Sequence, residues 1–259
     1  MQKTSKLYQD LLSVPHRVET RLAIGTQGYL IDEVASRISI GGLRIPVNDG
    51  SAESGYGEQT LVSLKTSASA FGDGAPVVGR TIAGEIEITM LRPKATIPRR
   101  ARLVPYVRLT DGIRHSEWIQ KGVYYVDTRS FEDSYGDADL LHIHGYDAMM
   151  SAEQDYPDSR LQWPALDIDV VREIADFLGV PVDPRTVRLM TAGHRISFPA
   201  GYTCREVLGY IAALYLGSFV MSDLGQLRLI TLISLPRPTN YLVTEYGAPI
   251  TIGGLHIHV

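Results

Sequence analysis

The sequence contains a single cysteine, Cys204, and only two tryptophans among its 259 residues. One thiol excludes an intrachain disulfide and any zinc site built from cysteines. Its charges nearly balance, with 25 Lys and Arg against 29 Asp and Glu, for a formal net charge of −4. This balance argues against a protein that binds nucleic acid by neutralising phosphates. No apolar run approaches the length of a signal peptide or a membrane span, so we expect a soluble protein without stable membrane association.

Signatures of common enzyme classes are also missing from the sequence. It contains no P-loop, no GxGxxG and no GxSxG motif, and no HExxH pair of histidines. We therefore predict a protein that is not an enzyme, with no catalytic residue, no cofactor and no bound metal.

What the sequence does contain is a repeat of nineteen residues. Residues 29–47 read YLIDEVASRISIGGLRIPV and residues 241–259 read YLVTEYGAPITIGGLHIHV, with ten identical positions in a gapless alignment. Chance would give about one or two matches in so short a stretch. A unit used twice favours assembly over catalysis. Each copy is predicted to form a β-hairpin.

The first part of the chain has the alternation of β-strands. In the segment TIAGEIEITM, Ile86, Ile88 and Met90 alternate with Glu85 and Glu87, as expected for a strand with one buried face. Further strands are predicted at 101–109, 118–131 and 139–147, whereas the Gly- and Ser-rich residues 48–60 are predicted to be a loop. Strands of this length without long helices between them indicate an antiparallel barrel or sandwich.

The middle of the chain has helical spacing. The segment LDIDVVREIADFLG predicts a helix capped by Asp167 and ended by Gly179, and YTCREVLGYIAALYLG predicts a second helix ended by Gly217. Thr203 and Glu206 form a T-x-x-E capping box at the start of the second helix. The segment SFVMSDLGQLRLITL then predicts a hairpin.

The predicted fold class is α+β in three parts. An N-terminal antiparallel β-barrel covers residues 1–157, and a small α/β domain of two helices and a hairpin covers residues 158–236. Residues 237–259 form a returning β-hairpin that repeats the N-terminal one, and it either starts a second barrel or packs on the first.

Histidine pairs are the first candidates for chemistry. His142 and His144, like His256 and His258, are two residues apart and would share a strand face, where two imidazoles can bind one metal. No motif supplies a third ligand. We favour strand histidines that face solvent over a metal site.

Charged residues give two further candidates. A basic group around two prolines suits a polyanion or a subunit-facing loop, and we favour the loop because the chain as a whole is acidic. Its members are Arg92, Lys94, Arg99, Arg100 and Arg102. Glu85 and Glu87 suit acid–base chemistry or a solvated strand face, and we favour the second.

Asp147 and Cys204 are the remaining single residues of interest. Asp147 is placed to cap a short helix that follows it. Cys204 lies at a helix start, where the pKa of a thiol can fall, but no histidine pattern accompanies it. We favour a half-buried structural cysteine.

Four segments, taken in order, resemble a known family. They are VVGRTIAGEIEITM with IPRRARLVPYVRL, WIQKGVYYVD, LHIHGYDAMMSAEQDY and YTCREVLGYIAALYLGSFVMSDLGQLRLI. Together they resemble the tail hub proteins of bacteriophages, the baseplate hub or tail-associated proteins of prophages of Gram-positive bacteria. The resemblance spans roughly residues 15–235 and rests on patterns of fold rather than on catalytic motifs.

The resemblance implies a structural role in the virion. Members of this family carry a barrel like the tail-tube subunit, an inserted α/β domain and a second barrel, and three copies form a ring. Such a ring would join the tail tube to the central spike or fibre, contact the distal tail and tape-measure proteins, and pass DNA only in transit. The protein would be assembled in the bacterial cytoplasm and reside at the tail tip, or baseplate. The chain ends where the second barrel of the family would begin.

Two other functions remain alternatives. A tail-associated cell-wall hydrolase would need catalytic residues that the sequence does not pair. A carbohydrate-binding β-module would use exposed tyrosines, for which Tyr124, Tyr125 and Tyr135 are the candidates.

Overall fold

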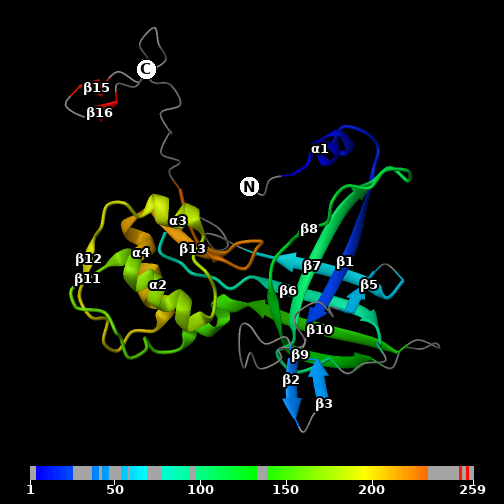
Figure 1. The fold of residues 1–259 in the computed structure, drawn as a ribbon, viewed down its shortest axis with the longest axis horizontal. Coiled ribbons are helices and arrows are strands. Elements are labelled where there is room, and N and C mark those ends of the chain that lie inside the picture. Colours follow the sequence, from blue (N-terminus) through cyan, green and yellow to red (C-terminus); the bar gives the residue numbers. More distant parts are fainter. Residues whose placement is uncertain are drawn as a thin grey trace.

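The computed structural model shows a curved antiparallel sheet beside a smaller unit of helices and hairpins (Figure 1). The structure describes residues 4–25, 37–40, 43–46, 54–57, 59–68, 78–93, 97–132, 139–232, 251–252 and 255–256. The fold is thus α+β with a large antiparallel sheet, as the sequence predicts.

Among the described residues, eight strands form the main sheet, and all of their pairings are antiparallel. The spatial order is β4-β1-β7-β9-β10-β6-β5, with β8 paired to β7. The strands are β1 (Arg17–Gly25), β4 (Ser54–Tyr56), β5 (Leu61–Ser67), β6 (Glu85–Leu91), β7 (Arg102–Thr110), β8 (Ile119–Gln120), β9 (Tyr124–Glu132) and β10 (Leu140–Asp147).

The alternation in the sequence sets the two faces of this sheet. On β6, Ile86, Ile88 and Met90 are buried in the sheet core, while Glu85 and Glu87 point outward, as predicted. On β7, Leu103 enters the same core, but Val104 on the opposite face is fully buried as well, in a small cluster with Val123. The sheet therefore buries part of its second face too.

The sheet does not close into the barrel predicted from the sequence. Strands β4 and β5 stand at the two ends of the strand order, and no ladder joins them within the described residues. The backbone N–H groups of Thr60 and Leu61 both donate to the carbonyl of Gly57, at 2.9 Å each. This turn sends β5 toward β6 instead of back along β4, which is only three residues long. The predicted loop at 48–60 was also wrong in part, because it contains β4.

Two short hairpins form separate two-stranded sheets, and they belong to the two copies of the repeat. Strand β2 (Arg37–Ile40) pairs with β3 (Leu43–Pro46), and β15 (Thr251–Ile252) pairs with β16 (Leu255–His256). The register is equivalent: Ile40 pairs with Leu43, as Ile252 pairs with Leu255.

The second unit packs its helices around its own core. Its elements are η1 (Ala148–Glu153), β11 (Ala165–Leu166), α2 (Asp167–Leu178), α3 (Pro184–Leu189), β12 (Arg195–Ile196), α4 (Cys204–Leu214), β13 (Gly217–Met221) and β14 (Leu227–Thr231). Met149, Ile174, Leu208, Ile211 and Phe219 are the largest fully buried side chains of this core. Because Met149 lies in η1, the segment directly after β10 already packs with the helices. The domain boundaries at 157 and 236 stay a prediction.

Helix α2 begins differently from the prediction, although its end is as expected. Gly179 ends the helix with a left-handed backbone, φ 68°, which glycine adopts without steric cost. The residue at the N-cap is Leu166, and Asp167 is the first residue of the helix instead. The Asp167 carboxylate is fully buried, where it accepts hydrogen bonds from the Tyr215 hydroxyl at 2.5 Å and the Ile168 N–H at 2.7 Å.

Helix α4 has the predicted capping box but not the predicted end. The Thr203 hydroxyl accepts from the Glu206 N–H, and the Glu206 carboxylate accepts from the Thr203 N–H at 2.8 Å. Leu216, not Gly217, takes the positive φ of 50° after the helix. Gly217 instead begins β13, where a Cβ atom would stand 2.3 Å from the Ile230 carbonyl oxygen. Close strand packing therefore requires this glycine.

Two short helices were not predicted. Helix α1 (Lys6–Leu12) is capped by Ser5, whose hydroxyl accepts from the Tyr8 N–H at 3.1 Å and donates to the Glu117 carboxylate at 2.5 Å. Helix α3 is capped by Asp183, which accepts from the Arg185 N–H at 2.8 Å. None of the helices in the described ranges is long and apolar enough to cross a membrane.

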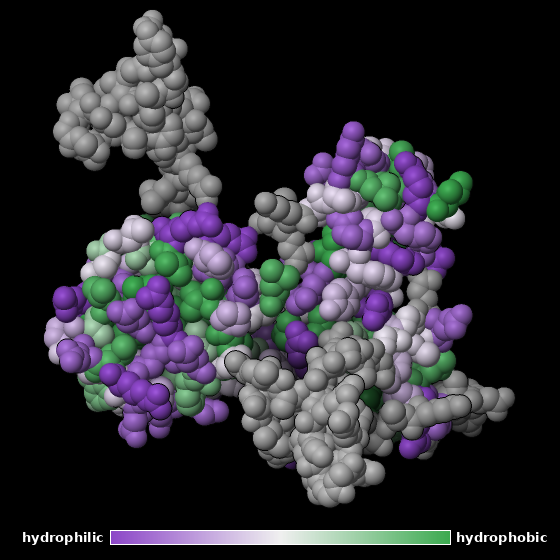
Figure 2. All heavy atoms as spheres, in the orientation of Figure 1, coloured by the Kyte–Doolittle hydropathy of each residue, from purple (hydrophilic) through white to green (hydrophobic). Residues whose placement is uncertain are grey.

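The two units meet where strands and loops of the sheet touch α4 and its hairpin. The Gly79 N–H donates to the Gly217 carbonyl at 2.7 Å, and the Gly122 N–H donates to the Asp223 carbonyl at 3.1 Å. A Cβ on Gly209 of α4 would stand 2.4 Å from the Gly79 oxygen. The junction is thus a backbone contact that glycine makes possible. Figure 2 shows hydrophilic and hydrophobic residues mixed over the visible face of both units.

Candidate functional site

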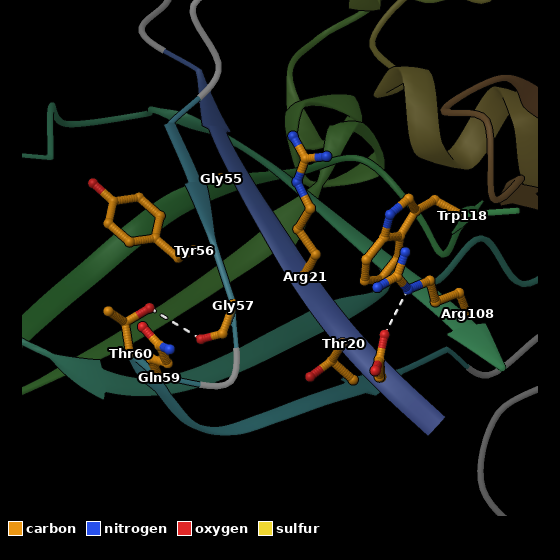
Figure 3. A pocket seen from close by; sticks show the side chains of 10 residues that line it. Thr20, Arg21, Gly55, Tyr56, Gly57, Gln59, Thr60, Arg108 and Trp118 are labelled. Carbon is orange, nitrogen blue, oxygen red and sulfur yellow. Dashed lines mark hydrogen bonds and ion pairs between the residues drawn. The ribbon is translucent and has the colours of Figure 1, made fainter. Parts of the chain in front are cut away.

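A groove of about 650 Å3 is the candidate site. It opens at the β4 edge of the sheet and is lined by β1, β4, the turn at 57–60, β7 and Trp118 (Figure 3). Its lining is mixed, with aromatic rings, amide and hydroxyl groups and three charged side chains.

An ion pair stacked on an indole ring forms one wall of the groove. Glu19 and Arg108 are directly opposite in the β1–β7 register, and the Arg108 Nε donates to the Glu19 carboxylate at 2.5 Å. The Arg108 guanidinium also lies over the Trp118 ring, 4.5 Å from its centroid, in a cation–π contact. The hydrogen bond from Arg108 holds the pKa of Glu19 below its usual value. The positive charge of Arg108 is therefore already balanced.

Arg21 is the unbalanced charge of the groove. It is half-buried, and it has no hydrogen-bond or ion-pair partner among the residues that the structure describes. Its guanidinium lies against the backbone of Gly55 on β4 (Figure 3). A Cβ atom on Gly55 would stand 2.8 Å from the Arg21 Nε. The absence of a side chain at Gly55 therefore makes the space that Arg21 occupies.

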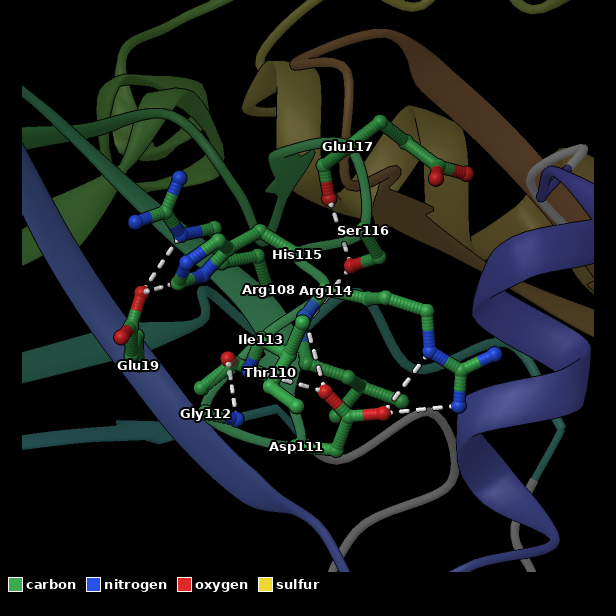
Figure 4. A network of polar contacts seen from close by, with 11 residues as sticks. Glu19, Arg108, Thr110, Asp111, Gly112, Ile113, Arg114, His115, Ser116 and Glu117 are labelled. Atoms are coloured by element: carbon green, nitrogen blue, oxygen red, sulfur yellow. Dashed lines mark hydrogen bonds and ion pairs between the residues drawn. The ribbon is translucent and has the colours of Figure 1, made fainter.

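Hydrogen bonds hold the loop that follows β7 (Figure 4). Asp111 accepts from the backbone N–H groups of Ile113 and Arg114, at 3.0 and 2.8 Å, and from the Arg114 guanidinium. These bonds, with those from Arg114 the largest cause, lower the pKa of Asp111 to about 2. Ser116 closes the loop, because its hydroxyl accepts from the Leu109 N–H at 2.9 Å and its N–H donates to the Leu109 carbonyl.

The histidine pair of β10 is not brought to the groove. His142 and His144 lie on the outer face of β10, where the His142 Nδ1 contacts the Thr89 hydroxyl at 3.1 Å and the His144 Nε2 is 3.9 Å from Glu85. In the described part of the chain, no group of three His, Cys, Asp or Glu side chains gathers as a metal site would require. His256 lies on β16, and His258 is outside the described residues.

The charged candidates are scattered and mostly exposed. Arg92 pairs with Asp139 at 3.3 Å and lies over the Phe131 ring. Arg99 and Arg100 are exposed on a turn, and Lys94 is outside the described residues. On the outer face of β6, Glu85 is half-buried and Glu87 is exposed, with Glu87 3.7 Å from Lys65, in agreement with a solvated strand face.

Asp147 and Cys204 take structural positions. Asp147 caps η1, as predicted, by accepting from the Met149 N–H at 2.9 Å, and it also accepts from the Gly84 N–H at 2.7 Å. Burial raises the pKa of Asp147 to about 6. Cys204 is fully buried rather than half-buried, and burial raises the pKa of its thiol to about 11 instead of lowering it.

Of the three tyrosines named for the carbohydrate-binding alternative, the two that the structure describes are not exposed. Tyr124 is buried in the sheet core, and burial raises the pKa of its hydroxyl to about 12. Tyr125 packs between the sheet and the helical unit, and Tyr135 is outside the described residues. The groove itself was missed, because Glu19 and Arg108 are far apart in sequence and no local signal joins them.

Comparison with known proteins adds two solved structures. No protein-family model matches the chain, and no curated protein sequence matches it. The 43 kDa tail protein of prophage MuSo2 from Shewanella oneidensis is similar over 84% of this chain and 56% of that chain, with 13% identity and a TM-score of 0.46. A tail protein from Neisseria meningitidis MC58 is similar over 83% and 51%, with 13% identity and a TM-score of 0.42.

This chain therefore spans about half the length of those two tail proteins.

Proposed function

We propose that this protein is a structural component of a phage tail or a phage-tail-like particle, and that it is a hub at the distal end of the tail. In this proposal, copies of the chain associate into a ring that joins the tail tube to the central spike or fibre. The partners are other copies, most simply in a trimer, and neighbouring tail proteins. DNA passes through the ring only in transit, and the protein has no enzymatic role.

The observation that carries the proposal is the pair of hairpins in equivalent register. Each hairpin forms its own two-stranded sheet and pairs with no other strand in the part of the chain that the structure describes. An isolated two-stranded hairpin is only marginally stable in water. A second subunit that supplies the missing strands would stabilise both hairpins.

The open sheet gives a matching surface for such pairing. Strands β4 and β5 end the strand order without a further partner among the described strands, and the unpaired backbone groups of an edge strand can pair with another chain. Each pairing rotates one copy relative to the next by a fixed angle. A closed ring forms when a whole number of these rotations adds up to a full turn. The four ordered segments that resemble tail hub proteins support the same role.

The test is the assembly state of the purified chain and of its hairpin variants. Ser39→Pro and Thr251→Pro change equivalent positions of the two hairpins and place proline inside a paired strand, which removes a backbone donor. Wild-type protein should form a ring or a trimer in mass photometry and negative-stain microscopy. The two variants should remain monomeric. The helical signal in their far-UV circular dichroism spectra should equal that of the wild type.

The repeat itself provides the matched controls. Ser39→Thr and Thr251→Ser exchange the residue of one copy for that of the other, and both should assemble like the wild type. A wild-type chain that stays monomeric at high concentration and does not join purified tail components would refute the proposal. A lytic band on a cell-wall zymogram would favour the hydrolase alternative.

A further inference from the structure

The groove beside Arg21 has the chemistry of a binding site that the proposed tail role does not use. One cation, Arg21, is half-buried without a partner in the described residues, while the neighbouring Arg108 is neutralised by Glu19 at 2.5 Å. The groove therefore presents one uncompensated positive charge. A guanidinium binds a carboxylate with two parallel hydrogen bonds, and this pairing is stronger than a neutral hydrogen bond.

The rest of the groove suits a ring with hydroxyl groups. The half-buried Trp118 ring stands on one side, and Gln59 and Thr60 of the turn stand on the other (Figure 3). The Thr60 hydroxyl donates to the Gly57 carbonyl at 3.0 Å, so its oxygen is left to accept from a ligand. The Gln59 amide both donates and accepts, and Trp118 offers apolar ring surface and an N–H donor.

Phosphate polymers fit this arrangement less well. A nucleic acid or a polyphosphate is held by several cations along its backbone. Among the described residues of the groove there is one free cation, next to the Glu19 carboxylate. A sugar that carries one carboxylate per residue or per disaccharide matches both the single charge and the mixed aromatic and amide walls.

We propose that this groove binds an acidic saccharide, with Arg21 pairing with the sugar carboxylate and Trp118, Gln59 and Thr60 contacting its ring and hydroxyl groups. Arg108 and Glu19 position Trp118 through the cation–π contact of 4.5 Å. Gly55 is the positioning residue for Arg21, since any side chain there would meet the guanidinium. This binding is independent of ring assembly, so it is measured on monomeric and assembled chain alike.

The test is a titration of the full-length chain followed by NMR. The probes are a tetrasaccharide of alternating glucuronate and N-acetylglucosamine, tetragalacturonate, neutral chitotetraose, and sodium acetate. The protein has two tryptophans, Trp118 and Trp163, so its spectrum contains two indole N–H signals. We expect at least one acidic saccharide to shift the Trp118 signal alone, and to bind about ten-fold or more tightly than chitotetraose.

Two variants test the role of Arg21 in binding, and each has a matched control for effects of the substitution elsewhere in the protein. Arg21→Gln removes the charge, and Gly55→Ala displaces the guanidinium; both should lose about ten-fold or more in affinity. Gly25→Ala is the matched glycine control, because Gly25 is outside the groove lining and a Cβ there would meet only the Arg102 Cβ, at an ordinary contact distance of 3.8 Å. Arg188→Gln removes an exposed arginine of α3 as the matched charge control. Both controls should bind like the wild type.

Four results would overturn the inference. They are the absence of binding by both acidic saccharides, equal affinity for chitotetraose, unchanged binding by Arg21→Gln, and an acetate affinity equal to that of the saccharides. The last result would reveal a simple anion site. Each of these readouts measures saccharide binding, so a chain that binds no acidic saccharide leaves the ring proposal standing. A monomeric chain that binds acidic saccharides would refute only the ring.

Discussion

Gly209→Ala tests whether the junction between the two units is as tight as the structure shows. Gly209 lies in the interior of α4, where alanine is favoured over glycine by about 1 kcal/mol in a free helix. Helix propensity alone therefore predicts that the variant is more stable. The structure predicts the opposite sign.

The magnitude follows from the contact with Gly79. The new Cβ atom would stand 2.4 Å from the Gly79 oxygen, about 1 Å closer than an ordinary van der Waals contact. Overpacking of this kind costs about 1–3 kcal/mol. A shift of residue 79 would also disturb its hydrogen bond to Gly217, which is 2.7 Å long and worth about 1 kcal/mol. After the propensity gain, the net destabilisation is about 1–3 kcal/mol.

The assay is urea and thermal unfolding followed by circular dichroism. A loss of this size lowers Tm by at least about 2 °C in a chain of this length. Ala213→Gly, one turn further along α4, is the control, and it should lose about 1 kcal/mol through helix propensity. A Gly209→Ala variant that melts above the wild type would show that residues 78–82 do not press on α4.

Three further predictions concern the single residues Asp147, Thr203 and Cys204. Since burial raises the pKa of Asp147 from 3.8 to about 6, the folded state keeps a proton that the unfolded state has lost. The unfolding free energy of the wild type relative to Asp147→Asn should therefore fall by about 2.5 kcal/mol between pH 4 and pH 7, as measured by urea titration. Thr203→Ala should cost about 1 kcal/mol in chemical denaturation, whereas Thr203→Ser, which keeps the cap, should cost much less. Cys204, fully buried with a raised thiol pKa, should react with Ellman's reagent at pH 8 only after unfolding; fast reaction of the native protein would contradict its burial.

Features that depend on near neighbours in sequence were predictable. The alternation in β6 predicted which side chains are buried, because strand residues two apart share a face. The capping box of Thr203 and Glu206 and the helix end at Gly179 were equally local. Asp147 was placed correctly as a cap for the same reason.

Features that depend on how distant strands meet were not predictable. Gly217 looked like a helix end, but its conformation is decided by the Ile230 carbonyl across the β13–β14 hairpin. The closed barrel was a reasonable expectation from strand number and length. Whether β4 and β5 pair depends on the turn at Gly57, which no alternation pattern shows.

The sequence by itself determined the α+β class, most of the strand and helix positions and the repeat at 29 and 241, because side-chain periodicity and capping act within a few residues. The tertiary structure alone decided the open sheet and the groove. Glu19 meets Arg108 and Arg21 meets Gly55 only through the β1–β7 and β1–β4 registers. Those registers are fixed by which faces can be buried together, and burial is a property of the whole fold.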